Sequence, residues 1–265
     1  MIITSAQNPK IKQAIRLNDR RHREREGLMV VEGFDELALA LKSGVRPQTL
    51  FYCPALFAGN AEELLAPARA TGAEMIEVSP PVFEKLAYRE NPDGWLALVP
   101  TQNVRQHLSD LVLGEHPLLV IAEAVEKPGN LGAILRSADA AGVHALILCD
   151  PTTDLSNPNV VRSSRGTLFT VPVAEAQVEE AVSWLRERQI ALIATSPQAK
   201  LIYTQADLRG PVAIAVGTEK EGLSAAWLEK ADVSVRIPMR GRVNSLNVAT
   251  ATTLLLYEAV RQRNT

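Results

Sequence analysis

Two periodicities of hydrophobic and polar positions alternate along the chain, and they predict strands interleaved with helices. Short apolar runs such as LMVVEG and TLFYC are typical of buried strands, whereas DELALALKSG and AEELLAPARATG have the apolar spacing of amphipathic helices. The pattern also predicts a basic helix over residues 8–26 and a closing strand at GWLALV. The first hundred residues are therefore expected to form a small α/β domain.

The alternation begins again after residues 101–116, a stretch that is polar at its start and is interpreted as a linker. The strands predicted beyond it, among them LLVIAEAV, HALILC, IALIAT and PVAIAVG, are apolar almost throughout. Such strands are typical of a parallel sheet that helices cover on both faces. The pattern therefore predicts two α/β domains, residues 1–100 and 117–265, joined by the linker.

Composition narrows the class of protein. The chain is 46% hydrophobic and 22% charged, as expected of a folded globular protein. No apolar run approaches the ~18 residues of a membrane span, and the first residues lack the apolar segment of a signal peptide. Cys53 and Cys149 are the two cysteines, and the four histidines show no metal-ligand spacing. We therefore expect a cytoplasmic protein without a bound metal.

Basic residues are concentrated in two short stretches, although the formal net charge is only −2. One stretch lies within the predicted helix 8–26, and the other precedes the last helix. Such clusters can contact phosphate groups of a nucleic acid, but a solvent-exposed helix face gives the first stretch the same pattern. The candidate contact residues are Lys10, Lys12, Arg20, Arg21, Arg23, Arg240 and Arg242.

Two loops that follow predicted strands carry residues suited to binding. In EAVEKPGNLGAILRSADAAGV, Asn130 is expected to cap a helix that starts at Leu131. Arg136 lies ~200° around this helix from its apolar stripe, so it is predicted to point away from the core. In VGTEKEG, Glu219 follows Gly217, and glycine lets a ligand approach the backbone closely.

A third loop leads into the last predicted helix, within residues 242–263, where Asn244, Ser245 and Asn247 crowd the expected first turn. A helix needs one such side chain as a cap, which leaves the others available to a ligand. Ligands of open α/β sheets bind beyond the carboxyl ends of the strands. We therefore expect the three loops to converge on one pocket.

In this order, the loops resemble the three motifs of the SpoU (TrmH-like) RNA ribose methyltransferases of the SPOUT superfamily. The N-terminal segment ITSAQNPKIKQ…VVEGFDELALAL is similar to the ribosomal-protein-L30e-like substrate-binding domain that many members carry. The sequence departs from the pattern at Lys127, where many members have an acidic residue, and at Ala249, where many have serine. The matching positions are Asn130–Leu131–Gly132 with Arg136, Gly217–Thr218–Glu219 with Gly222–Leu223, and Ile237–Pro238–Met239 with Ser245–Leu246–Asn247–Val248.

The resemblance implies a C-terminal α/β domain tied in a trefoil knot, a homodimer through that domain, and S-adenosyl-L-methionine (SAM) as the cofactor. It also implies methylation of a ribose 2′-hydroxyl in RNA, with 23S ribosomal RNA as the expected substrate because the L30e-like domain is common in rRNA-directed relatives. The basic stretches would then contact RNA. The implied catalytic residues are Arg136, Asn130, Glu219, Ser245 and Asn247, and the implied cofactor-binding residues are Thr195, Gly217, Ile237, Met239 and Leu246.

Alternative functions stay open at this point. A nucleotide-dependent oxidoreductase would need a GxGxxG fingerprint, which the sequence lacks. A tRNA 2′-O-methyltransferase, or a methyltransferase-like RNA-binding protein without catalysis, would have similar motifs. The motifs also do not separate housekeeping modification from resistance to a ribosome-directed antibiotic.

Overall fold

The computed structural model describes residues 2–264, and the chain divides into two compact units, each with its own sheet. The N-terminal unit comprises the chain up to Val104 together with Asp154–Thr170. The C-terminal unit comprises Arg105–Thr153 and the chain from Val171 onward. The segment Asp154–Thr170 therefore packs with residues that lie far before it in the sequence.

The N-terminal unit is built on a four-stranded sheet with the order β1-β4-β2-β3. Strands β2 and β3 are parallel, and the other two pairs are antiparallel. Its α-helices and strands are α1 (Pro9–Arg16), α2 (Arg20–Glu26), β1 (Leu28–Glu32), α3 (Phe34–Lys42), β2 (Thr49–Tyr52), α4 (Glu62–Ala70), β3 (Glu74–Glu77), α5 (Pro80–Leu86), β4 (Trp95–Pro100) and α7 (Pro158–Ser164). Short 3₁₀ turns are η1 (Pro54–Leu56), η2 (Thr101–Val104) and η4 (Thr167–Phe169).

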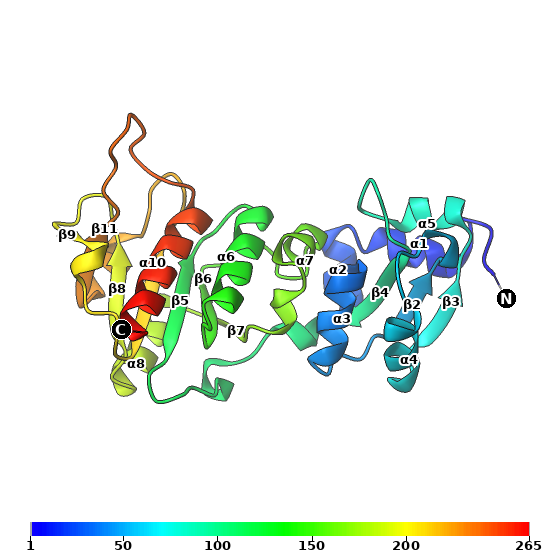
Figure 1. Ribbon diagram of the computed structural model, residues 1–265, viewed down its shortest axis with the longest axis horizontal. Helices are drawn as coiled ribbons and strands as arrows, with labels where there is room; N and C mark the ends of the chain where they lie inside the picture. Colours follow the sequence, from blue (N-terminus) through cyan, green and yellow to red (C-terminus); the bar gives the residue numbers. More distant parts are fainter. Residues whose placement is uncertain (1, 265) are drawn as a thin grey trace. The chain divides into compact units, whose positions relative to one another are not determined.

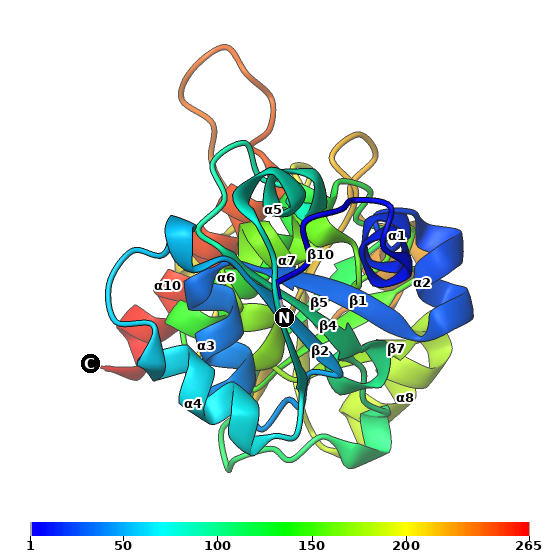
Figure 2. The ribbon, with the colours of Figure 1, turned by 90° about the vertical axis from the view of Figure 1, so that its right-hand side faces the viewer.

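Helices cover both faces of this sheet (Figure 2). On one face, α1 and α5 bring Ile11 and Phe83 against alternate strand residues such as Phe51 and Leu96, all of them buried. On the other face lie α3 and α4, which pack against each other. The predicted small α/β domain is thus confirmed by a mixed sheet with its own core.

The single helix predicted over residues 8–26 is wrong, because the chain forms two helices with a break between them. Leu17 is buried, and Asp19 caps α2 by accepting a hydrogen bond from the backbone N–H of Arg21 at 2.9 Å. Asp favours a helix start over a helix interior, so the cap ends the periodic pattern at this point.

The C-terminal unit is built on a seven-stranded sheet with the order β7-β6-β5-β10-β8-β11-β9, in which every pair is parallel. Its strands are β5 (Leu118–Glu123), β6 (Ala145–Cys149), β7 (Val173–Ala176), β8 (Ala191–Thr195), β9 (Leu201–Ile202), β10 (Val212–Val216) and β11 (Val233–Arg236). Its helices are η3 (Leu108–Asp110), α6 (Pro128–Ala140), α8 (Val178–Glu187), η5 (Tyr203–Gln205), α9 (Ala225–Lys230) and α10 (Val248–Arg263).

Helices cover both faces of the second sheet, as the apolar strands predict. The core on one face includes Trp184 of α8 and Trp227 of α9. On the other face, α6 and α10 lie side by side, and the hydroxyls of Ser137 and Thr253 are 2.7 Å apart between them (Figure 1). The chain between β11 and α10 forms a long loop that extends away from the sheet in both views (Figures 1 and 2). The trefoil knot stays a prediction.

Candidate active site

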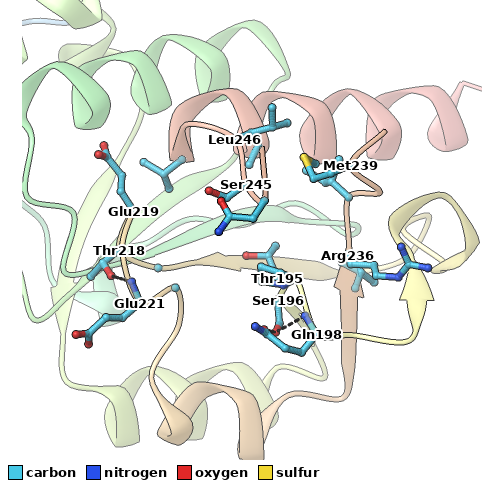
Figure 3. A pocket seen from close by; sticks show the side chains of 18 of the residues that line it. Thr195, Ser196, Gln198, Thr218, Glu219, Glu221, Arg236, Met239, Ser245 and Leu246 are labelled. Carbon is cyan, nitrogen blue, oxygen red and sulfur yellow. Dashed lines mark hydrogen bonds between the residues drawn. The ribbon is translucent and has the colours of Figure 1, made fainter. Parts of the chain in front are cut away.

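Three neighbouring strands, β10, β8 and β11, end at the same edge of the parallel sheet. A cavity of about 300 Å³ lies at this edge. Figure 3 shows Ser245 and Leu246, from the loop before α10, on the opposite side of the cavity from Thr195 and Ser196 at the end of β8. The expected cofactor and catalytic residues that line it are Thr195, Gly217, Glu219, Ile237, Met239, Ser245 and Leu246.

The loop after β10 forms one wall of this cavity as a tight turn. The backbone N–H of Thr218 donates to the Gly222 carbonyl at 3.0 Å, and the N–H of Gly222 donates back at 3.1 Å. A side chain at Gly217 would not fit, because its Cβ would lie 2.1 Å from the Gly222 carbonyl oxygen. The hydroxyl of Thr218 also accepts the N–H of Glu221 at 3.0 Å (Figure 3). Glycine at position 217 therefore lets backbone groups form this wall of the cavity.

Asn247 is the residue that caps the last helix. Its Oδ1 accepts the backbone N–H groups of Ala249 at 3.0 Å and Thr250 at 3.4 Å. Its Nδ2 donates to Oδ1 of Asn130 at 3.0 Å, which joins the third loop to the first. Because α10 begins at Val248, Asn244 and Ser245 precede the helix and do not lie in its first turn as expected.

Asn130 is not the cap of α6, contrary to the prediction. The helix begins at Pro128, and Lys127 takes the cap position without a side-chain bond. Proline is favoured at the first helical position because its φ is already helical and it has no N–H to satisfy. Asn130 thus lies in the first turn, where its Nδ2 is buried without a partner among residues 2–264. A buried donor left unpaired costs free energy, so it marks a place for a ligand group.

Arg136 is exposed on α6, six positions after Asn130, as its spacing from the apolar stripe predicts. Within the described residues its guanidinium has no carboxylate partner, and it does not line the 300 Å³ cavity. Arg136 is thus a charged group on the same helix as Asn130, and that helix packs against α10.

An ion pair that the sequence does not reveal joins the first two loops. Lys127 Nζ lies 2.6 Å from Glu219 Oε2, and this bond holds the pKa of Lys127 above its usual value. Both residues line a second cavity of about 70 Å³, which shares Gly217 and Thr218 with the first. The departure from the family pattern at Lys127 therefore changes the surroundings of Glu219.

The first basic stretch separates into exposed and buried members. Lys10, Lys12, Arg20 and Arg21 are exposed, although Lys10 pairs with Glu74 and Arg20 with Glu24. In the second stretch, Arg240 and Arg242 are exposed on the loop before α10. The exposed members keep their place as candidate RNA contacts.

The prediction that Arg23 contacts RNA is wrong. Its side chain is only 2% exposed, and its Nη2 lies 2.8 Å from Oδ2 of Asp154. Its Nη1 donates to the carbonyl oxygens of Leu17 and Asn18, both at 2.9 Å. An arginine that is buried and bonded in this way is not available to a phosphate group.

Several cavity residues escaped the sequence analysis. Ser196 and Gln198 follow β8 directly, so the rule that ligands bind beyond strand ends could have found them. Arg236 is the last residue of β11, and it also lines the cavity. Over residues 2–264, no helix is long and apolar enough to span a membrane, and no His, Cys, Asp or Glu cluster could hold a metal ion.

Comparison with known proteins identifies the class to which this fold and site belong. Residues 117–257 match the SpoU rRNA Methylase family, and residues 8–97 match the MRM3-like substrate binding domain. The chain therefore belongs to the SpoU family of SAM-dependent RNA 2′-O-ribose methyltransferases, which confirms the resemblance seen in the motifs.

Similarity extends over most or all of the length of individual relatives. The chain is 35% identical over 255 residues to a 23S rRNA (uridine(2479)-2′-O)-methyltransferase of Streptomyces viridochromogenes, covering 93% of this chain and 87% of that protein. The crystal structure of an RNA 2′-O ribose methyltransferase matches with a TM-score of 0.86 and 42% identity over 100% of both chains. An AdoMet-bound rRNA methyltransferase from Sinorhizobium meliloti matches with a TM-score of 0.89 and 32% identity, covering 98% of this chain and 97% of that one.

The cavity fits SAM by the chemistry of its walls. Its volume of about 300 Å³ is within the range of small-molecule sites, ~300–1,000 Å³. Met239 and Leu246 offer apolar surface to an aromatic base, and Thr195 and Ser196 offer hydroxyls. Gly217 leaves the backbone of its loop uncovered, so backbone groups can form the hydrogen bonds.

Proposed function

We propose that this enzyme methylates a ribose 2′-hydroxyl of ribosomal RNA, with 23S rRNA as its substrate. The observation that carries the proposal is the convergence of three motif loops at one sheet edge, where the Asn247–Asn130 bond joins two of them beside the cavity. The relative from S. viridochromogenes, which carries a 23S rRNA 2′-O-methyltransferase name, supports the choice of RNA.

The cofactor would be held mainly by backbone groups. Gly217, Ile237 and Leu246 would bind its adenosine part, with Thr195 and Met239 beside them. SAM supplies an electrophilic methyl group when bound. The protein must then orient the ribose, stabilise the charge that develops on its oxygen, and help the proton leave.

Arg136 would supply the charge stabilisation. A guanidinium keeps its proton in proteins, so it cannot serve as the general base. It can bind the phosphate next to the target ribose and stabilise the developing 2′-alkoxide through charge-assisted hydrogen bonds. That phosphate or a water molecule would accept the proton.

Asn130 would orient Arg136 or the ribose, because its bond from Asn247 fixes which end of its amide faces the buried side. Glu219, held by Lys127, would bind a polar group of the substrate or order its loop. Ser245, which precedes the helix and caps nothing, is free to bind the cofactor or the RNA.

RNA would also contact the exposed basic residues. These are Lys10, Lys12, Arg20 and Arg21 in the N-terminal unit and Arg240 and Arg242 on the loop before α10. Phosphates and 2′-hydroxyls dominate the recognition of structured RNA, so cations distributed in this way suit such a substrate.

The active form would be a cytoplasmic homodimer joined through the C-terminal unit. Leu254 and Tyr257 are 38% and 49% exposed on α10, and their i, i+3 spacing places them on one face of that helix.

Cys53 and Cys149 are buried free thiols, and burial raises the pKa of Cys149 to about 12. Unreactive free thiols are in keeping with a reducing compartment.

The test is incubation of the protein with labelled SAM and separate pools of unmodified rRNA and tRNA, followed by nucleoside mass spectrometry. A 2′-O-methylated nucleoside in the rRNA pool is the expected result. Methylation only of tRNA would refute the choice of substrate, and SAM binding without transfer to either pool would favour a non-catalytic RNA-binding protein.

Arg136→Ala should lower methyl transfer by about 10²–10³-fold, the usual effect of removing one donor to a developing oxyanion. SAM affinity, measured by calorimetry, should stay within a few-fold of the wild type because Arg136 does not line the cofactor cavity. Arg186→Ala, at an exposed arginine of α8, is the matched control and should change neither quantity. Equal losses of transfer and SAM binding in Arg136→Ala would contradict the assigned role.

A further inference from the structure

The N-terminal unit contains a separate cavity of about 620 Å³, and no residue of the methyl-transfer motifs lines it. Three arginines line it: Arg89 follows α5, Arg162 belongs to α7, and Arg165 comes directly after α7. Tyr88 lines it as well. Its wall therefore combines residues from both parts of the sequence that form this unit.

Tyr88 is held at the surface by its backbone. Its N–H donates to Oε2 of the buried Glu32 at 2.8 Å, while its side chain remains 45% exposed. The guanidinium carbon of Arg162 lies 5.8 Å from the centre of the Tyr88 ring, within the range of a cation–π contact. An exposed aromatic ring beside an arginine is the kind of surface on which proteins stack unpaired bases.

The three arginines differ in how their charge is compensated. Arg89 pairs with Glu36 at 2.5 Å, and Arg165 pairs with Asp35 at 2.6 Å. Arg162 instead donates to the neutral Oδ1 of Asn159 at 2.9 Å and has no carboxylate partner among residues 2–264. Arg162 is thus the cation that remains available to a phosphate.

The carboxylates of the cavity limit its net charge. Glu36 is engaged with Arg89, and burial raises the pKa of this carboxyl above its usual value. Glu90 is an exposed carboxylate that also lines the cavity. Because arginines and carboxylates both line the cavity, its charge alone does not favour the binding of any anion. The exposed ring of Tyr88 is the feature that indicates a ligand with an aromatic base.

We propose that this cavity binds an unpaired nucleotide of the RNA substrate, with the base stacked on Tyr88 and a phosphate bound by Arg162. The inference rests on the proposed function and adds a point of substrate recognition that the catalytic motifs do not contain. It also gives a role to the packing of Asp154–Thr170 in the N-terminal unit, because that segment carries Arg162 to Tyr88.

The experiment measures binding of the full-length protein to unmodified 23S rRNA transcript by filter retention over a series of NaCl concentrations. Tyr88→Ala should lower RNA affinity by about 5- to 100-fold, the usual cost of losing one stacked base, and should leave the salt dependence unchanged. Tyr88→Phe keeps the ring and should bind as the wild type does. Arg162→Gln should lower affinity and reduce the slope of log K against log [NaCl] by about 0.7–1.

The matched control is Arg69→Gln, which removes an exposed arginine of α4 in the same unit and should change neither affinity nor slope. SAM affinity and the urea unfolding curve should be unchanged in every variant, and the unfolding curve excludes a loss of folding in the N-terminal unit. If the wild type methylates rRNA and both Tyr88→Ala and Arg162→Gln bind it normally, this inference is overturned while the proposed function stands. If the wild type neither binds nor methylates rRNA, the proposed function is refuted, and the inference that rests on it is refuted with it. Polyglutamate is the probe for an acidic protein partner. If the wild type binds polyglutamate and these variants do not, while their RNA binding is intact, the cavity binds an acidic protein and the inference is overturned.

Discussion

Asn247 shows at the scale of one residue how a helix cap can also organise a site. Its side-chain oxygen satisfies two N–H groups of the first turn of α10, and its nitrogen donates to Asn130. The cap therefore determines which end of the Asn247 amide faces Asn130, and the Asn130 oxygen is committed to that bond. The remaining polar atom, Asn130 Nδ2, is turned to the buried side without a partner among the described residues.

Substitution at Asn247 should separate these two roles. Asn247→Ala should lower the free energy of unfolding by about 0.5–2 kcal/mol, because the cap is lost, and should also impair methyl transfer. Asn247→Asp keeps an oxygen for the cap and should retain stability, yet it cannot donate to Asn130, so transfer should fall by about tenfold. Urea unfolding and initial rates with rRNA measure both effects. Full activity in Asn247→Asp would show that the bond to Asn130 does not matter for catalysis.

At the scale of one element, the turn after β10 owes its shape to a glycine that has no room for a side chain. The β10 strand is buried along its whole length, and it delivers Gly217 to the sheet edge as part of the tight turn closed by Thr218 and Gly222. The backbone of this turn is also a wall of the 300 Å³ cavity, which we propose holds SAM. A change that widens the turn is therefore expected to weaken SAM binding.

Gly217→Ala should weaken SAM binding by about tenfold or more, because the new Cβ would lie 2.1 Å from the Gly222 carbonyl oxygen and the backbone must move. Gly241→Ala is the matched control, since that glycine, in the loop before α10, has no heavy atom within 4 Å of the added Cβ. Calorimetric titration with SAM compares the two. Normal affinity in Gly217→Ala would mean that the turn is not part of the cofactor site.

At the scale of the whole molecule, the unexpected feature is the placement of Asp154–Thr170 in the N-terminal unit. Arg23 and Asp154 form its buried anchor, with Ser156 Oγ donating to Asp154 at 2.7 Å. Burial acts to raise the pKa of Asp154, but the hydrogen bonds from Ser156 and Arg23 outweigh it and hold the pKa below its usual value. The ionised pair thus fastens the segment that carries Arg162.

Asp154→Asn should lower the free energy of unfolding by about 3–5 kcal/mol, because it leaves the Arg23 charge buried without its partner. Since the folded pKa of Asp154 is depressed, its contribution is fully present above the ordinary carboxyl pKa of 3.8 and is lost as the pH falls through the lower folded value. The difference between wild type and variant should therefore be constant from pH 5 to 8 and shrink only below about pH 3.8.

Urea unfolding across this pH range is the measurement, and Arg21→Ala, at an exposed neighbour on α2, should change stability by less than about 0.5 kcal/mol. An unfolding midpoint for Asp154→Asn equal to that of the wild type would show that the buried pair does not fasten the segment.

The sequence by itself determined the features that depend on local pattern. Continuous apolar runs such as β5 and β10 predicted the parallel sheet, and the rule for strand ends predicted that the loops at Gly217 and Ser245 would meet. Asn130 was misplaced as a cap because Pro128 competes for the helix start two residues earlier. The strands β7 and β9 were missed because they are short and lie at the two edges of the sheet.

Only the tertiary structure decided the features that depend on a distant partner. Whether a basic side chain such as Arg23 faces solvent or the core depends on Asp154, which lies 131 positions later in the chain. The cavity of Tyr88 and Arg162, and the ion pair of Lys127 with Glu219, likewise need residues far apart in sequence. A periodic pattern records which face of an element is buried, but it does not contain the identity of the group against which that face packs.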